Sequence, residues 1–119
     1  MDQPEPTNVP DYFPEDPPKF FIGQRVCHVR YGYRGLIVDF DMSCHADDDW
    51  YHANPAPPDR QQPWYHVLVH GSAENAYVAQ ENLAADRVDD AIVHPLIDRY
   101  FTGGASGVYE RNDRVWPSW

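Results

Sequence analysis

Basic residues are scarce in this chain of 119 residues: lysine and arginine together number 9, against 19 aspartate and glutamate residues. The formal net charge of −10 has the wrong sign for a general nucleic-acid binder. Such a protein relies on cationic side chains that displace counterions from phosphates. The charge balance therefore favours a protein partner over nucleic acid.

Long apolar runs and a signal sequence are also lacking. The longest apolar run, residues 35–38, is far shorter than the roughly 20 residues that span a bilayer. The chain opens with an acidic, proline-rich stretch instead of the charged-then-apolar pattern of a signal peptide. We therefore expect a cytoplasmic protein that does not associate with membranes.

Cysteine is rare, and its spacing does not suit a metal site. Cys27 and Cys44 are each followed directly by a histidine, and neighbouring residues of a strand point to opposite faces. Zinc sites use ligands at short, fixed spacings instead. We expect two reduced thiols, a buried Cys27, and no metal or cofactor. His28 and His66 are expected to meet a carboxylate or a backbone carbonyl across a sheet.

Signatures of catalysis are missing as well. No serine lies in a Gly-x-Ser-x-Gly elbow, and the glycines at 103–107 lack the lysine of a phosphate-binding loop. A dyad of cysteine and histidine finds no support in the residues that flank Cys27 or Cys44. The acidic run at 47–49 is typical of a solvated loop. The sequence thus indicates a protein that is not an enzyme.

The distribution of proline divides the chain into an arm and one domain. Residues 1–19 hold six of the 12 prolines among five carboxylates, so we expect a disordered or extended arm. Residues 20–119 form the predicted domain, with a long loop over 42–62 that has neither a helix period nor a strand period. A C-terminal helix or flap is expected over 88–119, and the helix lies near 95–101, with Gly103 and Gly104 just past its end.

Alternating apolar residues predict strands at 24–31, 36–40, 64–70 and 76–80. Glycines at 32 and 35 mark the turn between the first two strands. In the second strand, Leu36, Val38 and Phe40 are expected to face one way. The fold class is therefore mainly β.

Aromatic residues make up 14% of the chain, more than a small core needs. Tryptophan and tyrosine are favoured anchors of protein interfaces. The candidate contact residues are Trp50 and Tyr51 in the long loop, Trp64 at the start of a strand, and Tyr12 and Phe13 in the arm.

Three segments resemble one known family. They read GQRVCHVRYGYRGLIVDFD over 23–41, PWYHVLV over 63–69 and YVAQENL over 77–83. Together they look like the YccV-like or HspQ family, also called the hemimethylated DNA-binding domain. The stretch HPLIDRYF over 94–101 resembles a longer form of this domain, which occurs fused to F-box proteins and to chloroplast protease adaptors.

The resemblance implies a small SH3-like antiparallel β-barrel without catalytic activity, which self-associates as a homo-oligomer. It also implies two functions. One is a heat-shock role as a protease adaptor, with an ATP-dependent protease or its substrates as partners. The other is binding of hemimethylated duplex DNA, for which Arg25, Arg30 and Arg34 form the candidate face. Because the chain is strongly acidic, we favour the adaptor function and keep DNA binding as the alternative.

Overall fold

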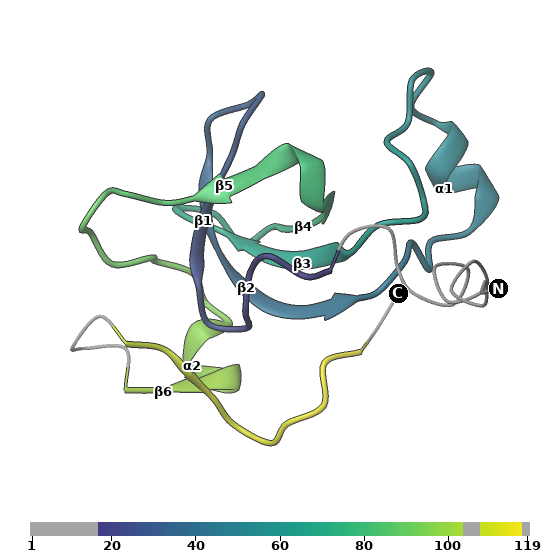
Figure 1. Cartoon of the computed structure of the whole chain (residues 1–119). Helices are drawn as coiled ribbons and strands as arrows, with labels where there is room; N and C mark the ends of the chain where they lie inside the picture. The colour runs from purple at the N-terminus through teal and green to yellow at the C-terminus, as the bar shows by residue number, and fades with distance from the viewer. Residues whose placement is uncertain (1–16, 104–107, 118–119) are drawn as a thin grey trace, which may run out of the picture.

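The computed structural model describes residues 17–103 and 108–117, which form a twisted five-stranded antiparallel sheet and a smaller C-terminal layer beneath it (Figure 1). The elements of the sheet and its connections are β1 (Arg25–His28), β2 (Arg34–Asp41), α1 (Asp48–His52), β3 (Trp64–Val69), β4 (Asn75–Ala79), the 3-10 turn η2 (Gln80–Asn82) and β5 (Leu83–Ala85). The C-terminal layer holds α2 (Ile97–Tyr100), β6 (Phe101–Thr102) and β7 (Glu110–Arg111).

The strand order is β4-β3-β2-β1-β5, and every pairing is antiparallel. One face of the sheet encloses a core of Val26, Ile37, Tyr65, Val67, Val78 and Leu83. The predicted mainly β class is confirmed. In the part of the chain that the structure describes, β4 and β5 end the sheet, and η2 connects them.

The alternation predicted for the second strand is wrong at its far end. Leu36 and Val38 pack against residues of the C-terminal layer. Phe40 packs on the opposite face of the sheet, against the core that contains Tyr65. The pairing of β2 with β3 shifts register between Ile37 and Asp39. Such a bulge adds a residue to one strand, so the side chains beyond it change face.

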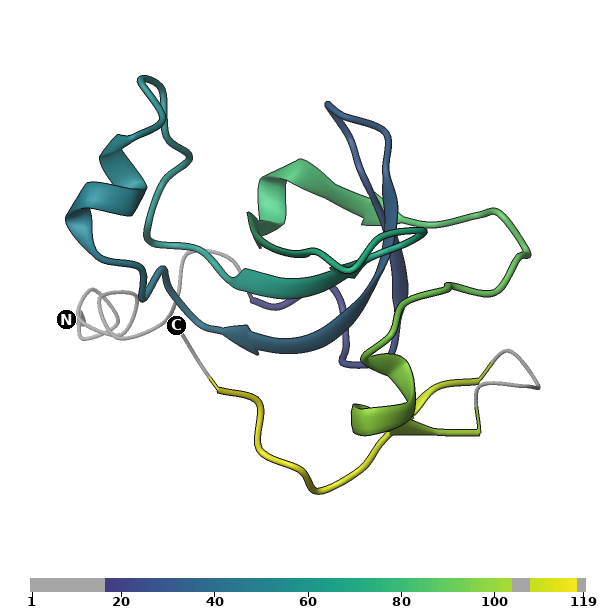
Figure 2. The same cartoon turned by 180° about the vertical axis from the view of Figure 1, so that it is seen from behind.

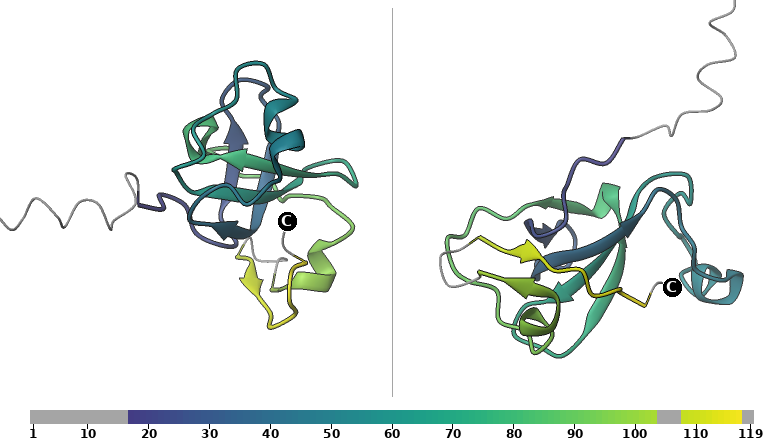
Figure 3. Two further views of the ribbon diagram at one scale, coloured as in Figure 1. Left: turned by 90° about the vertical axis from the view of Figure 1, so that its right-hand side faces the viewer. Right: turned by 90° about the horizontal axis from the view of Figure 1, so that it is seen from below.

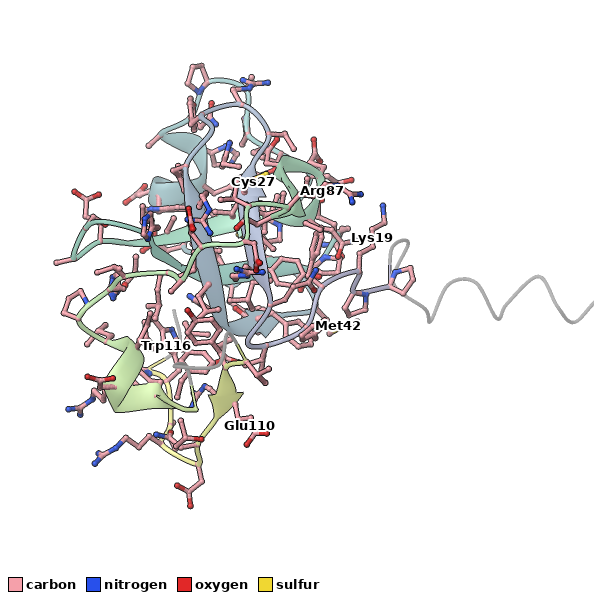
Figure 4. All side chains as sticks on the ribbon, turned by 90° about the vertical axis from the view of Figure 1, so that its left-hand side faces the viewer. Lys19, Cys27, Met42, Arg87, Glu110 and Trp116 are labelled. Carbon is pink, nitrogen blue, oxygen red and sulfur yellow. The ribbon has the colours of Figure 1, made fainter. Side chains whose placement is uncertain are left out.

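The outer face of the sheet is covered by the C-terminal layer. Leu36, Val38 and Leu68 pack there against a cluster of later residues, namely Ile92, Tyr100, Phe101, Tyr109 and Trp116. Figure 3 shows α2 and β7 lying over β2 and β3 when the molecule is seen from below. Figure 4 places Trp116 between the sheet and α2. The helix expected near 95–101 is thus confirmed as the shorter α2.

The segment 42–62, predicted to lack regular structure, contains the short helix α1. The carboxylate of Asp47 caps this helix by accepting a hydrogen bond of 2.9 Å from the backbone N–H of Trp50. Asp48 and Asp49 occupy the first turn, where the helix dipole favours negative charge. The acidic run that we interpreted as a solvated loop is therefore a helix start.

The first strand and Cys27 differ from the sequence predictions. The first strand ends at His28, not at residue 31, and β5 was not predicted at all. Cys27 is only half-buried, whereas Cys44 is buried, and both cysteines are free as expected. Among the described residues, no helix is both long and apolar enough to cross a membrane.

Candidate functional site: an aromatic cleft along strand β4

A cleft of about 800 Å³ runs along β4. The β1–β2 connection and the segment after α1 rise on the same side of the sheet and form its two walls (Figures 1 and 2). We call the walls the hairpin wall (residues 28–33) and the α1 wall (residues 50–58), and the whole the aromatic cleft. Its ring-bearing lining residues are His28, Tyr31, Tyr33, Trp50, Tyr51, Trp64, His66, Tyr77 and Trp116.

The floor of the cleft is a continuous row of rings. The ring centroid of Tyr77 lies 5.8 Å from that of Trp50 and 5.3 Å from that of Trp64. His66 stacks on Tyr77 at 4.5 Å and lies 5.9 Å from Trp116. Strand pairing explains the row, because His66 is directly opposite Tyr77, and Trp64, two residues earlier, shares the face of His66.

Hydrogen bonds and a stacked cation hold the α1 wall in place. The hydroxyl of Tyr51 donates to the carbonyl of Pro58 at 2.6 Å. The guanidinium of Arg60 lies 4.1 Å from the ring centroid of Tyr51 and also bonds Asp48 at 2.8 Å. Trp50 stays 40% exposed, and no residue of α1 is buried. The wall is thus braced internally while Trp50 remains accessible.

The hairpin wall is organised by a buried histidine. The Nδ1 atom of His28 accepts hydrogen bonds of 3.1 Å from the backbone N–H groups of both Arg30 and Tyr31. Its ring stacks on Tyr31 at 4.6 Å and contacts Tyr33 at 5.1 Å. Gly32 takes a φ of 79°, which few other residues adopt, and closes the turn. The structure therefore gives the ring of His28 backbone donors instead of the expected carboxylate or carbonyl.

Burial, followed by the charge of Arg30, lowers the pKa of His28, so its ring is neutral near pH 7. Neutral Nδ1 can accept the two backbone bonds, whereas a protonated ring cannot. Burial also raises the pKa of Tyr33 to about 12, with the nearby Tyr31 adding to the effect. The rings of His28 and Tyr33 are therefore uncharged near neutral pH.

Asp41 forms a polar cluster behind the row of rings. Its Oδ2 atom accepts a hydrogen bond of 2.6 Å from the Tyr77 hydroxyl and lies 3.4 Å from Nε2 of His66. On the other side, Nδ1 of His45 lies 3.5 Å from Oδ1. Nε2 of His66 is buried without a hydrogen-bond partner in the described structure. Burial lowers the pKa of His66, against the opposing effect of the carboxylates at 41 and 39, and so favours the neutral ring.

The three arginines predicted as a possible DNA face are separated by their contacts. Arg34 bonds the carboxylate of Asp86 through Nε at 2.9 Å and through NH2 at 2.8 Å. Arg34 also donates to the carbonyl of Asp90, as Arg25 does at 3.0 Å. Arg30, in contrast, lines the aromatic cleft. The structure thus engages two of the three with an acidic segment of the same chain.

The Arg34–Asp86 pair is nearly enclosed, with 16% of the arginine side chain and 3% of the aspartate side chain exposed. Burial acts to raise the pKa of Asp86, but the hydrogen bond and charge of Arg34 hold it below its usual value. Both partners are therefore charged in the folded protein, and the pair ties β2 to the chain after β5.

Of the residues predicted as protein contacts, Trp50, Tyr51 and Trp64 come together in the cleft. Trp64 is only 2% exposed and is mainly the base on which Trp50 rests. Tyr12 and Phe13 lie outside the described residues. Sequence reasoning missed His66, Tyr77 and Tyr31 as site residues.

The alternation of β3 and β4 could have identified His66 and Tyr77, once the two strands were aligned. Within the described residues, no group of three or more histidine, cysteine, aspartate or glutamate side chains is arranged to hold a metal ion. The lining of the cleft presents aromatic rings and hydrogen-bonding side chains.

Comparison with known proteins adds family evidence. The sequence model of a family described as "Hemimethylated DNA-binding protein YccV like" matches residues 18–107. The chain is 37% identical over 87 residues to proteins named F-box only protein 21 from Homo sapiens, Mus musculus and Pongo abelii. The match covers 70% of this chain and 14% of each of those proteins, so the chain corresponds to a small part of them.

Proposed function

The chain belongs to the YccV-like family, and we propose that it acts as a non-enzymatic binding module that holds a segment of a partner protein in the aromatic cleft. The observation that carries this proposal is the continuous row of Trp50, Trp64, Tyr77 and His66 along an accessible cleft. Rings of this kind offer a large apolar area together with a polar edge, which suits them to protein interfaces.

Charge supports a protein as the partner. The lining of the cleft holds one basic residue, Arg30, and one acidic residue, Glu81. The chain as a whole carries −10, which repels a polyanion over the distance at which charges act in solution. From the family resemblance, we propose an ATP-dependent protease or one of its substrates as the partner class, with the module as the adaptor.

A capture experiment with matched baits tests the adaptor function. The full chain, Trp50→Ala and the control Val93→Ala are each immobilised and exposed to a cell lysate and then to a purified ATP-dependent protease. Trp50 is accessible at the cleft, whereas Val93 is 65% exposed and does not line it. We expect the full chain and Val93→Ala to retain the protease or its substrates, and Trp50→Ala to lose them.

Equal capture by all three baits would show that the cleft is not the contact. Retention of neither a protease nor a protease substrate by the full chain would remove the adaptor function.

DNA binding is the second candidate, favoured by the family's description as hemimethylated DNA-binding and by Arg30 at the cleft. If it is right, affinity for a hemimethylated duplex falls steeply as salt rises. Arg30→Ala should then weaken binding, whereas Arg25 and Arg34, already engaged with residues 86–90, should matter less. Gel shifts that are absent or insensitive to salt, on methylated, hemimethylated and bare duplexes, would eliminate this function.

A further inference from the structure

The aromatic cleft is well suited to an extended, proline-rich segment. Such segments are already close to the polyproline II conformation, so they lose little conformational entropy when they bind. Grooves lined by tyrosine and tryptophan recognise them by packing rings against the proline rings. In this cleft, Tyr31 and Tyr33 face the cleft from the hairpin wall, and Trp50 and Tyr51 from the α1 wall.

The chain itself contains a proline-rich segment. Residues 1–16 include Pro4, Pro6, Pro10 and Pro14, and Tyr12 and Phe13 stand between the last two. The same residues carry five carboxylates and no lysine or arginine. The cleft lining holds one basic residue, Arg30, which can pair with one of these carboxylates, and one acidic residue, Glu81.

The start of the described chain tethers this segment next to the cleft. The side chain of Gln80 donates to the carbonyl of Pro17 at 3.1 Å and accepts from the backbone N–H of Lys19 at 2.8 Å. The residues on either side of Gln80, Ala79 and Glu81, both line the cleft. A polyproline II segment rises about 3.1 Å per residue, so the residues before Pro17 can extend for roughly 50 Å, enough to reach either wall.

We infer that residues 1–16 dock in the aromatic cleft of their own chain and compete there with the partner segment. The inference rests on the proposed function of the cleft as a peptide-binding site. A short tether gives an effective concentration on the order of 1 mM. A docking contact with a dissociation constant of about 0.1 mM would then reduce the affinity for a partner roughly tenfold.

The test uses the full chain, so that only the docking segment changes. In a four-alanine variant, Pro4, Pro6, Pro10 and Pro14 are all replaced by alanine. Two-dimensional ¹H–¹⁵N NMR spectra then report the indole Nε1–H resonances of the tryptophans. We expect the Trp50 resonance to differ between the two proteins.

A peptide of residues 1–16, added to the four-alanine variant, should move the Trp50 resonance back toward its position in the unaltered chain. The same peptide with its prolines replaced by alanine is the control and should have no effect. Coincident Trp50 resonances in the two proteins, with no response to the peptide, would overturn the inference. A difference that disappears on dilution would also overturn it, because the occupant would then be the segment of a second copy.

Partner binding separates this inference from the proposed function. If both hold, the four-alanine variant captures the partner roughly tenfold more tightly than the unaltered chain. If the variant and the unaltered chain capture the partner equally, docking fails while the proposed function survives. If the Trp50 resonance moves but neither protein captures a partner, docking is supported and the adaptor function is not.

Discussion

The two surfaces that the sequence offered as contact sites, the three arginines and the aromatic residues, differ in what surrounds them. Arg25 and Arg34 contact carbonyls and carboxylates of residues 86–90, which lie after β5. Trp50 instead rests on Trp64 and Tyr77 and remains 40% exposed. A charged group is available to a ligand only where the chain does not already supply its counter-groups. A ring that packs on other rings can still expose part of its surface, as Trp50 does.

The largest effect on stability should come from removing a buried ring of the aromatic row, and removing an exposed ring should have less effect. Trp64→Ala removes a ring that is 2% exposed and that donates to the carbonyl of Asp59, so we expect a loss of about 3–5 kcal/mol in the free energy of unfolding. Trp50→Ala should cost less stability and mainly reduce partner binding. Urea denaturation and partner capture measure the two effects.

Equal losses of stability in the two tryptophan variants would contradict this division. It would mean that Trp50 is part of the core and not an accessible contact.

A somewhat smaller loss of stability is expected when Arg34, which forms a buried ion pair, is removed. Arg34→Ala leaves the carboxylate of Asp86, 3% exposed, without its partner. Breaking a buried ion pair in this way costs about 3 kcal/mol, whereas Arg30→Ala, on the cleft side, should change stability by less than about 0.5 kcal/mol. Thermal or urea unfolding of both variants compares them directly.

The double variant Arg34→Ala with Asp86→Asn is the control for that comparison. It should recover part of the lost stability, because the uncompensated charge is gone. A double variant no more stable than Arg34→Ala would show that the arginine acts through packing and not through its pair.

The smallest effect is the loss of stability at mildly acidic pH, which depends on the buried histidines of the aromatic cleft. Burial lowers the folded-state pKa of His28 and of His66 from 6.5. The unfolded chain therefore binds protons first, and stability falls as the pH drops through 6.5 toward the folded values. Each such group contributes up to about 1.4 kcal/mol per pH unit in that range.

His66→Gln should remove its share of this slope, and it should leave the contribution of His28 in place. The measurement is urea denaturation at a series of pH values from neutral down to mildly acidic. An unchanged slope in His66→Gln would show that the buried ring does not titrate differently on folding.

Several features of the fold could be predicted because they depend on local pattern. Period-two alternation located β1 to β4, and the helix predicted near 95–101 contains α2. The bulge in β2 could not be predicted, since nothing in the alternation of Leu36 and Val38 signals an extra residue before Phe40. The sequence did contain a local signal for α1, namely an aspartate cap followed by acidic residues in the first turn. Because the segment is so acidic, it was interpreted as a solvated loop instead.

The candidate site was only partly predictable. Trp50, Tyr51 and Trp64 could be selected by residue type, but residue type does not show that Trp64 supports Trp50 instead of contacting solvent. His66 and Tyr77 become site residues only when β3 and β4 are paired in one register. In the sequence, Arg34 is grouped with two other arginines, whereas in the structure it forms an ion pair with Asp86, which lies far away in the chain.

By itself, the sequence determined the mainly β class, the approximate places of the first four strands, the acidic charge and the resemblance to a family, because each depends on composition or on residues near one another in the chain. The tertiary structure decided which rings gather in the aromatic cleft and which arginines are bonded to residues of the same chain. These outcomes depend on contacts between segments far apart in the chain, whose relative positions are set by strand register, by the bulge in β2 and by burial of the core.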